Sequence, residues 1–218
     1  MAELVPAILT NDISDFRHKY ADLLALGNYF SKLHIDFIDG NFLPDKTISP
    51  KDLSFLKSPF ALMAHLMAYN PEQYYDDLVR AGFKSALVHF EAFKTADEAL
   101  SAIREGRGKG LSMGLAINPE TPLHETAKIL SRVNLVQIMG VHPGAQGRSF
   151  EPGTLEKIRE LKSLTRDVII SVDGGVKLGI ANRCEQAGAD LIIIGSAILH
   201  SSHPKEALSA FKRELELV

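Results

Sequence analysis

The chain has 218 residues, of which 45% are hydrophobic and 23% are charged, and its formal net charge is −3. A chain of this length buries roughly 70% of its unfolded surface on folding, so a stable core needs no disulfide bonds. The slightly negative charge excludes the broad basic surface with which proteins bind nucleic acid or anionic membranes. An anionic ligand would therefore need a local binding arrangement.

The amino-terminal segment and the single cysteine carry no targeting or redox signal. The first residues, MAELVPAILTND, contain no basic stretch, and no part of the chain reaches the ~18 apolar residues of a membrane span. Cys184 has no second cysteine to pair with, and we expect it to pack in a helix. These features predict a cytoplasmic protein with neither a nucleic acid nor a membrane partner.

Eight short stretches rich in Val, Ile, Leu and Met predict β-strands. Two of them, VIISV and LIIIG, are almost continuously apolar, which is typical of parallel strands covered on both faces. The predicted strands span residues 4–8, 29–37, 60–66, 85–89, 112–117, 135–139, 168–172 and 191–194.

Stretches with helical periodicity lie between these strands. The clearest span residues 12–27, 71–82, 152–164 and 204–218, and they open with Asp12 as an N-cap or with proline. Eight strand–helix units predict a single-domain α/β fold over residues 1–218, a (β/α)8 TIM barrel. The alternative is a doubly wound open sheet, which usually has a glycine-rich turn after its first strand, where this chain has LTND.

Four polar residues lie at predicted strand ends, where a barrel core needs none. His34 and Asp36 of HIDFIDG share one strand face, His65 stands between two methionines on its own face, and Asp173 ends the seventh strand. Singly, a strand histidine is commonly a hydrogen-bonded core residue, and a strand-end aspartate commonly caps the next helix. Together, two imidazoles and two carboxylates at one barrel mouth predict a divalent metal site, because buried charge is costly unless it is paired or metal-bound. This donor set favours one Zn²⁺ per subunit, with Fe²⁺, Mn²⁺ or Co²⁺ as alternatives.

Glycines follow three of the predicted strands and indicate a phosphate site. Glycines after strands 7 and 8 of a barrel form the usual phosphate pocket, in which backbone N–H groups hold the anion. If they were tight turns only, they would bind nothing. The candidate phosphate-binding residues are Gly144, Gly147, Gly174, Gly175, Gly195 and Ser196.

With these features in place, the sequence resembles the ribulose-phosphate 3-epimerase family from PAILTND to GSAI. The shared motifs, in the family's order, are HIDFIDGNFLP, HLM with NPEQY, AINPETP, IMGVHPGAQGRSF, VDGGV and AGADLIIIGSAI. The resemblance implies a barrel of the ribulose-phosphate-binding type and a self-associating protein. It implies the same four metal ligands, with Asp36 and Asp173 as acid and base and with Met67 and Met139 beside the reacting carbons. Its phosphate contacts match Gly147, Gly175, Gly195 and Ser196.

The sequence also departs from the family pattern around the expected sugar. Ala7 replaces a serine that contacts substrate, Ile38 replaces a third methionine, and Met63 replaces an aspartate. After the sixth strand, His142 stands where the family has Asn or Glu, and Gln146 stands where it has Gly. These departures bear on which sugar is bound and leave the metal ligands unchanged.

The chemistry implied is epimerisation at C3 of a phosphorylated ketose, which interconverts D-ribulose 5-phosphate and D-xylulose 5-phosphate. A metal would stabilise the enediolate, Asp36 would remove the C3 proton and Asp173 would return one to the opposite face. The alternatives are a 3-epimerase of a six-carbon ketose 6-phosphate of the allulose 6-phosphate type, and a non-catalytic sugar-phosphate-binding paralogue. An orotidine-type decarboxylase or aldolase is disfavoured, because HIDFID lacks the lysine of that group's pattern.

Other polar residues near the expected mouth have less defined roles. The candidate substrate pocket consists of Ala7, Met67, Met139 and His142, although His142 is expected chiefly to shape its loop. His89 ends the fourth strand and is a spare candidate ligand. Asp39 is expected to fix the loop that follows it, since it lies on the opposite strand face from Asp36.

Overall fold

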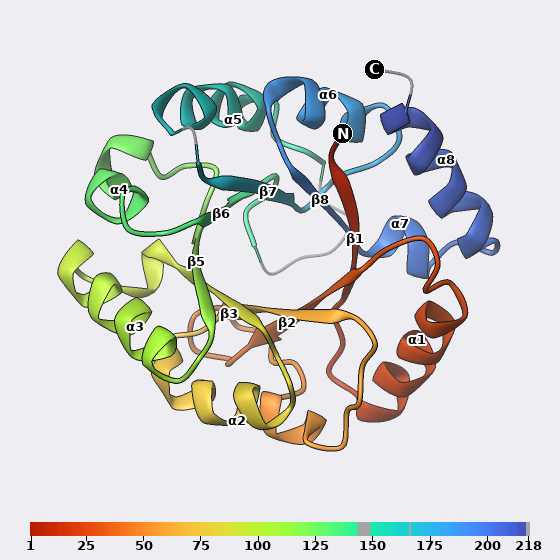
Figure 1. The fold of residues 1–218 in the computed structure, drawn as a ribbon, viewed down its shortest axis with the longest axis horizontal. Coiled ribbons are helices and arrows are strands. Elements are labelled where there is room, and N and C mark those ends of the chain that lie inside the picture. The colour runs from red at the N-terminus through yellow and green to blue at the C-terminus, as the bar shows by residue number, and fades with distance from the viewer. Residues whose placement is uncertain (144–148, 166, 217–218) are drawn as a thin grey trace.

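Eight parallel strands close into a barrel in chain order, each paired with its sequence neighbours and the first paired with the last (Figure 1). The computed structural model describes residues 1–143, 149–165 and 167–216. The strands are β1 (Glu3–Ile8), β2 (Lys32–Ile38), β3 (Ala61–Met67), β4 (Ser85–His89), β5 (Ser112–Ile117), β6 (Leu135–Met139), β7 (Ile169–Asp173) and β8 (Leu191–Ile194). The predicted (β/α)8 barrel is therefore confirmed.

The helices form a ring around the barrel (Figure 1). They are α1 (Ile13–Ala25), α2 (Tyr75–Arg80), α3 (Ala96–Gly108), α4 (Leu123–Leu130), α5 (Gly153–Leu164), α6 (Ile180–Ala187), α7 (Ser196–Leu199) and α8 (Pro204–Glu216). The short 3₁₀ turns among the described residues are η1 (Pro50–Leu53), η2 (Pro71–Tyr74) and η3 (Phe90–Ala92).

Most predicted element boundaries agree with the structure to within a few residues. The Asp12 carboxylate accepts hydrogen bonds from the backbone N–H groups of Ser14 and Asp15, at 2.6 and 2.8 Å, which confirms the predicted cap of α1. The stretch 71–82 is less regular than expected, because it begins as the 3₁₀ turn η2 and becomes α-helical only at Tyr75.

Alternation along each strand divides most of the buried apolar residues into two layers. The larger layer lies between the strands and the helices and includes Phe16, Tyr75 and Cys184. Cys184 is therefore a packing residue, as expected. The smaller layer lies inside the barrel and consists of Val5, Ala7, Met63, Leu87, Ala116, Leu135, Leu191 and Ile193. This inner layer closes the barrel, and the polar site lies beside it.

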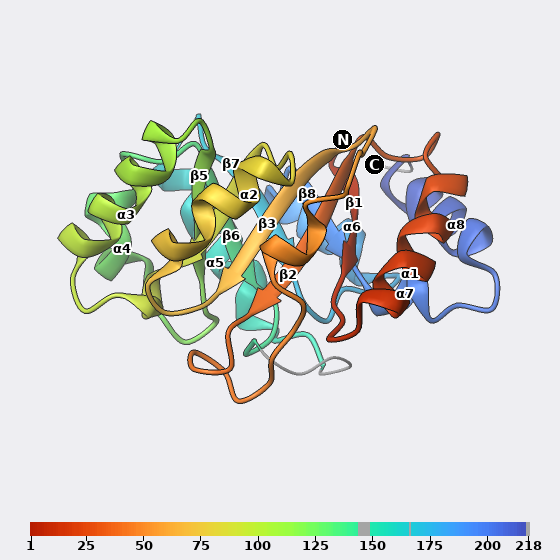
Figure 2. The same ribbon diagram turned by 90° about the horizontal axis from the view of Figure 1, so that it is seen from below.

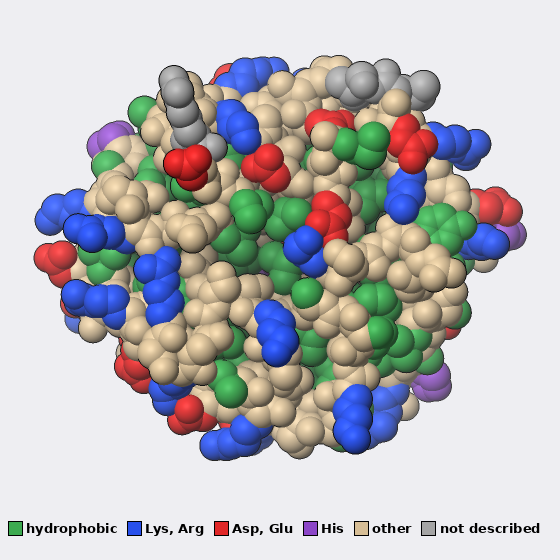
Figure 3. Space-filling model, viewed as in Figure 1, with side chains coloured by type: hydrophobic (Ala, Val, Ile, Leu, Met, Phe, Trp, Pro, Cys, Tyr) green, Lys and Arg blue, Asp and Glu red, His purple; other side chains and the backbone are tan. Residues whose placement is uncertain are grey.

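The long loops gather at one end of the barrel. Figure 2 shows the loop after β2 and the described residues that follow β6 projecting from the carboxyl ends of the strands, while the N-terminus and the carboxyl end of α8 lie toward the other end. Figure 3 shows the face at the amino-terminal ends of the strands, where charged side chains of both signs are interspersed around a hydrophobic centre. None of the helices in the described part of the chain is long and apolar enough to span a membrane.

The barrel interior is tightly packed at Gly114 of β5. A Cβ atom at this position would lie 2.7 Å from the carbonyl oxygen of Leu135 and 2.8 Å from the side chain of Leu87. We predict that Gly114→Ala lowers the free energy of unfolding by about 1–3 kcal/mol, the range typical of an overpacked core. Urea denaturation followed by circular dichroism measures this change.

The matched control is Gly108→Ala, at the last residue of α3, where an added Cβ meets nothing within 4 Å. This substitution should be neutral or should stabilise the protein by about 0.4–1 kcal/mol. Equal effects of the two substitutions would contradict the close packing at Gly114.

Candidate metal centre and substrate cavity

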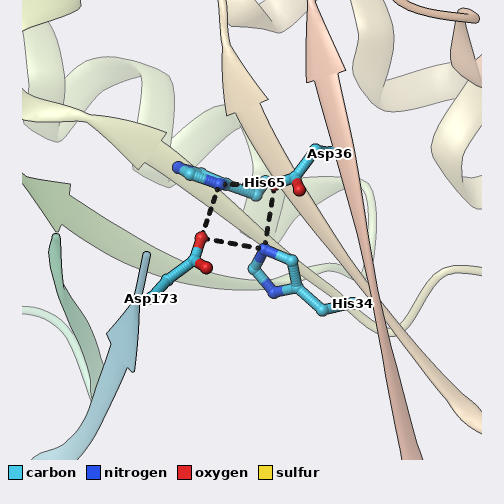
Figure 4. A group of neighbouring side chains, drawn as sticks. All are labelled: His34, Asp36, His65 and Asp173. Carbon is cyan, nitrogen blue, oxygen red and sulfur yellow. Dashed lines mark hydrogen bonds and ion pairs between the residues drawn. The ribbon is translucent and has the colours of Figure 1, made fainter. Parts of the chain in front are cut away.

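The four predicted metal ligands lie on three strands and point into the barrel. His34 and Asp36 project from β2, His65 projects from β3, and Asp173 is the last residue of β7. The pairing of β2 with β3 sets Asp36 beside His65, because the two residues are register partners. Figure 4 shows the four side chains turned toward one another. The structure thus brings together the residues that strand parity singles out.

The distances between the facing atoms match those of a metal-ligand set. Asp36 Oδ1 lies 2.8 Å from His65 Nδ1 and 3.2 Å from His34 Nε2. Asp173 Oδ2 lies 3.4 Å from His65 Nδ1 and 3.6 Å from His34 Nε2, and each residue has a candidate ligand atom within 4.8 Å of the others. A tetrahedral ion with bonds of about 2.1 Å separates its ligands by about 3.4 Å. The four residues therefore fit a divalent metal.

These four side chains are largely shielded from water, so their charges must be compensated by one another or by a bound cation. Both histidines are fully buried, and Asp36 is only 8% exposed. Burial acts to raise the pKa of Asp36, but the imidazoles of His34 and His65 hold it well below its usual range. Burial acts to lower the pKa of His65, but Asp173 and Asp36 raise it to about 9. In the metal-free protein at neutral pH, a protonated His65 is therefore paired with an ionised Asp36.

A second set of contacts orients Asp173. The side-chain amide of Gln137 donates to Asp173 Oδ2 at 3.2 Å, and its carbonyl oxygen accepts from the hydroxyl of Ser171 at 2.9 Å. Gln137 and Ser171 are fully buried. Sequence reasoning missed both residues, although strand parity places Ser171 on the same face as Asp173.

His89 lies behind His65 and outside the group of candidate ligands. Its Nε2 is 2.8 Å from His65 Nε2, and its Nδ1 is 3.1 Å from Glu91 Oε2. Burial acts to raise the pKa of Glu91, but hydrogen bonds from His89, Thr121 and the Asn118 backbone hold it below its usual range. Glu91 is thus an ionised carboxylate in a largely buried position, and sequence reasoning missed it.

A cavity at the carboxyl ends of the strands opens beside the ligand group. Its walls combine three of the four candidate metal ligands with most of the predicted pocket and phosphate-binding residues. Among the lining residues are Ala7, Asp36, His65, Met67, Met139, Asp173, Gly174, Gly175, Gly195 and Ser196. Three basic residues that were not expected there, Lys19, Lys177 and His200, also line it. The cavity therefore has a part lined by the candidate metal ligands and a part with glycines and cationic side chains.

The glycine pair after β7 has a backbone that only glycine adopts readily. Gly174 and Gly175 have φ angles of +98° and +70°. A Cβ on Gly175 would also lie 2.9 Å from the backbone nitrogen of Phe150. This turn exposes backbone to the cavity without a side chain in the way.

The remaining predicted site residues lie elsewhere or outside the described residues. The half-exposed imidazole of His142 pairs with Glu120 at 2.9 Å, and this histidine is not among the residues that line the cavity. Gly144 and Gly147 fall within residues 144–148, which lie outside the described part of the chain.

Asp39 fixes the loop that follows β2, as expected. One carboxylate oxygen accepts the backbone N–H groups of Asn41 and Phe42, both at 2.7 Å. The other accepts the backbone N–H of Tyr69 at 3.0 Å. This aspartate therefore links the two loops that follow β2 and β3.

Comparison with known proteins agrees with the geometry of this site. The model of the "Ribulose-phosphate 3 epimerase family" matches residues 3–199. The chain belongs to this family. Curated ribulose-phosphate 3-epimerases from Schizosaccharomyces pombe and Escherichia coli are 30% and 32% identical to it. The alignments cover 98% and 99% of this chain, and 94% and 96% of those relatives. It is therefore a member of an epimerase family of the isomerase class, whose enzymes serve the pentose phosphate pathway.

Solved structures share the barrel at low sequence identity. The crystal structure of KGPDC from Streptococcus mutans aligns with a TM-score of 0.75 and 16% identity, over 100% of this chain and 98% of that one. The tryptophan synthase complex from Pyrococcus furiosus aligns with a TM-score of 0.71 and 17% identity, over 98% of this chain and 96% of that one. These likenesses establish the fold of this epimerase-family member and nothing about its substrate.

The raised pKa of His65 predicts that a metal must displace a proton. With a pKa of about 9, His65 is protonated at pH 7, whereas Asp36 is already ionised. Zn²⁺ binding at pH 7 should therefore release about one proton, and this release should vanish well above pH 9. Titration calorimetry in buffers of different ionisation enthalpy measures the number of protons. Zn²⁺ binding without proton release at pH 7 would contradict this protonation state.

Proposed function

We propose that this protein epimerises C3 of a ketose phosphate, with D-ribulose 5-phosphate and D-xylulose 5-phosphate as the substrate pair. The observation that carries the proposal is the meeting of Asp36 and Asp173 with two imidazoles at the edge of a cavity. The two carboxylates come from β2 and β7, which are not neighbours in the barrel. Two separate carboxylates suit inversion, because a single base tends to return the proton to the face it left.

His34, Asp36, His65 and Asp173 would hold the divalent metal that the family resemblance implies, with Zn²⁺ favoured by the donor set. When bound, it supplies Lewis-acid stabilisation of negative charge on substrate oxygens. Asp36 is ionised at neutral pH, as a base must be, and would remove the C3 proton. Asp173, held by Gln137, would donate a proton to the other face.

The rest of the cavity suits the two ends of a sugar phosphate. Met67 and Met139 would provide apolar walls beside the planar intermediate. Backbone N–H groups around Gly175 and Gly195, together with the ammonium of Lys177, would hold the phosphate. This local arrangement meets the need for anion binding on a chain of net negative charge.

A six-carbon ketose 6-phosphate is the second candidate substrate. Ala7 lines the cavity without the hydroxyl group that the family resemblance leads us to expect, and its Cβ faces Gly195. A smaller, apolar wall there leaves more room for the sugar. This observation favours the allulose 6-phosphate-type substrate as the second candidate.

Two further expectations remain predictions. A cytoplasmic location is supported by the name of a relative from Oryza sativa, 31% identical over 99% of this chain, which is called the cytoplasmic isoform. Assembly into a homo-oligomer rests on the family resemblance alone.

We predict that Asp36→Asn and Asp173→Asn each slow exchange of the substrate C3 proton with solvent by about 10²-fold or more, because each removes a proton-transfer group. Proton NMR in D₂O measures this exchange, and circular dichroism verifies the fold. Asp45→Asn, in the exposed loop after β2, is the matched control and should exchange at the wild-type rate. Wild-type exchange in both active-site variants would remove these residues from the mechanism.

A panel of ketose phosphates tests the substrate. With excess Zn²⁺ or Mn²⁺, we expect the highest kcat/KM for D-ribulose 5-phosphate, and Ala7→Ser should further disfavour the six-carbon sugar. The opposite preference would establish the six-carbon alternative. Metal binding with no turnover of any member of the panel would indicate the non-catalytic paralogue.

A further inference from the structure

The outer nitrogen of His65 has a buried partner of its own. While Nδ1 faces the carboxylates of the metal centre, Nε2 lies 2.8 Å from Nε2 of His89. Figure 4 shows this second ring nitrogen of His65 pointing away from Asp36 and Asp173. Both rings are fully buried, so one proton must lie between the two nitrogens.

Glu91 decides which of the two histidines donates. Its Oε2 lies 3.1 Å from His89 Nδ1, and a carboxylate can only accept a hydrogen bond. Nδ1 of His89 must therefore carry the proton of a neutral ring, which leaves Nε2 as an acceptor. His65 consequently donates through Nε2–H, and Nδ1 is the nitrogen it presents to a metal.

We propose that Glu91, acting through His89, is a positioning pair that fixes the tautomer of the His65 metal ligand and thereby tightens metal binding. This inference rests on the metal centre proposed above. Neither residue touches the ligand group's centre, so both act through His65. The carboxylate–histidine arrangement corresponds to the outer contacts that orient histidine ligands in metal sites.

The position of Glu91 is itself fixed by the loop after β5. Its Oε1 accepts the backbone N–H of Asn118 at 2.9 Å and the hydroxyl of Thr121 at 2.5 Å. On the other side of the same loop, the ammonium of Lys157 donates to the carbonyl oxygens of Asn118, Pro119 and Thr121, at 2.6–2.8 Å. The loop therefore holds the carboxylate in one orientation.

The second histidine ligand offers an internal contrast. The ring of His34 presents Nε2 to the carboxylates, and its buried Nδ1 has no hydrogen-bond partner among the described residues. The tautomer of His34 is thus not set by an outer contact within that part of the chain. Of the two histidine ligands, the inference therefore predicts that only His65 depends on an outer hydrogen bond for its tautomer.

Glu91→Gln is a discriminating substitution because the shape of the side chain is unchanged. The backbone N–H of Asn118 can only donate, so the amide oxygen of the new side chain must occupy the Oε1 position. The NH₂ group of the amide then faces His89 Nδ1 and forces the proton of His89 onto Nε2. That proton points at His65 Nε2, and the preferred tautomer of His65 is reversed.

The decisive experiment measures Zn²⁺ affinity of the full chain by competition with a chelator. We expect Glu91→Gln to raise the Kd by about 10–100-fold. The control is Glu120→Gln, which makes the same change in an exposed carboxylate that pairs with His142, and it should leave the Kd unchanged. Adding His89→Gln to Glu91→Gln should recover affinity, because an amide at position 89 can turn its oxygen toward His65 Nε2–H.

Two outcomes would overturn the inference. One is a wild-type Kd for Glu91→Gln, and the other is a double variant that binds Zn²⁺ more weakly than Glu91→Gln, as a mere packing role predicts. ¹⁵N NMR of histidine-labelled, metal-free protein gives an independent reading above pH 9, where His65 is neutral: the proton of His89 should be on Nδ1 in wild type and on Nε2 in Glu91→Gln. A wild-type proton on Nε2 would refute the inference whether or not metal binds. Failure of the wild type to bind Zn²⁺ would instead refute the metal centre.

Discussion

The burial of two carboxylates and two imidazoles inside a closed barrel is the constraint on which the site depends. Charges in such a place are tolerated only if they compensate one another or share a cation. Barrel register provides part of the compensation, because it sets Asp36 beside His65. The same interior that packs apolar residues at one level holds polar ones at another. Each inward-facing strand position can therefore hold either an apolar residue that packs the barrel or a polar residue of the candidate site.

Around that group, further polar residues orient two of the four candidate ligands, Asp173 and His65. Asp173 is held by Gln137, which is held in turn by Ser171. His65 is held through His89 by Glu91. These contacts come from β4, β6 and β7 and from the loop after β4, so most of the barrel circumference contributes to the order of a site formed by three strands. Removing one of these outer contacts is therefore expected to alter the orientation of a candidate ligand, even though the ligand residue itself is unchanged.

Much of the fold and the central group can be predicted from the sequence, because both follow from periodicity. Alternation on a strand places His34 and Asp36 on one face, and eight strand–helix repeats imply closure. The outer contacts are harder to foresee, since they depend on register between strands. By its position at a strand end, His89 is predicted as a spare ligand. The register partner of His65 on β4 is Leu87, however, and His89, two residues further on, contacts the outer nitrogen of His65. Glu91 lies beyond a strand end and meets partners 27 and 30 residues further on, which local patterns do not indicate.

The segment 118–121 lies between a carboxylate and an ammonium, with Glu91 on one side and Lys157 on the other. Barrel enzymes generally diversify by lengthening the connections at this end of the strands. In this chain, a longer connection after β5 would move the backbone groups of residues 118–121 away from the Glu91 carboxylate and the Lys157 ammonium, with which they form hydrogen bonds. An insertion in this connection would therefore disturb the Glu91 carboxylate, and through it His89 and His65, although the insertion itself would lie outside the metal centre.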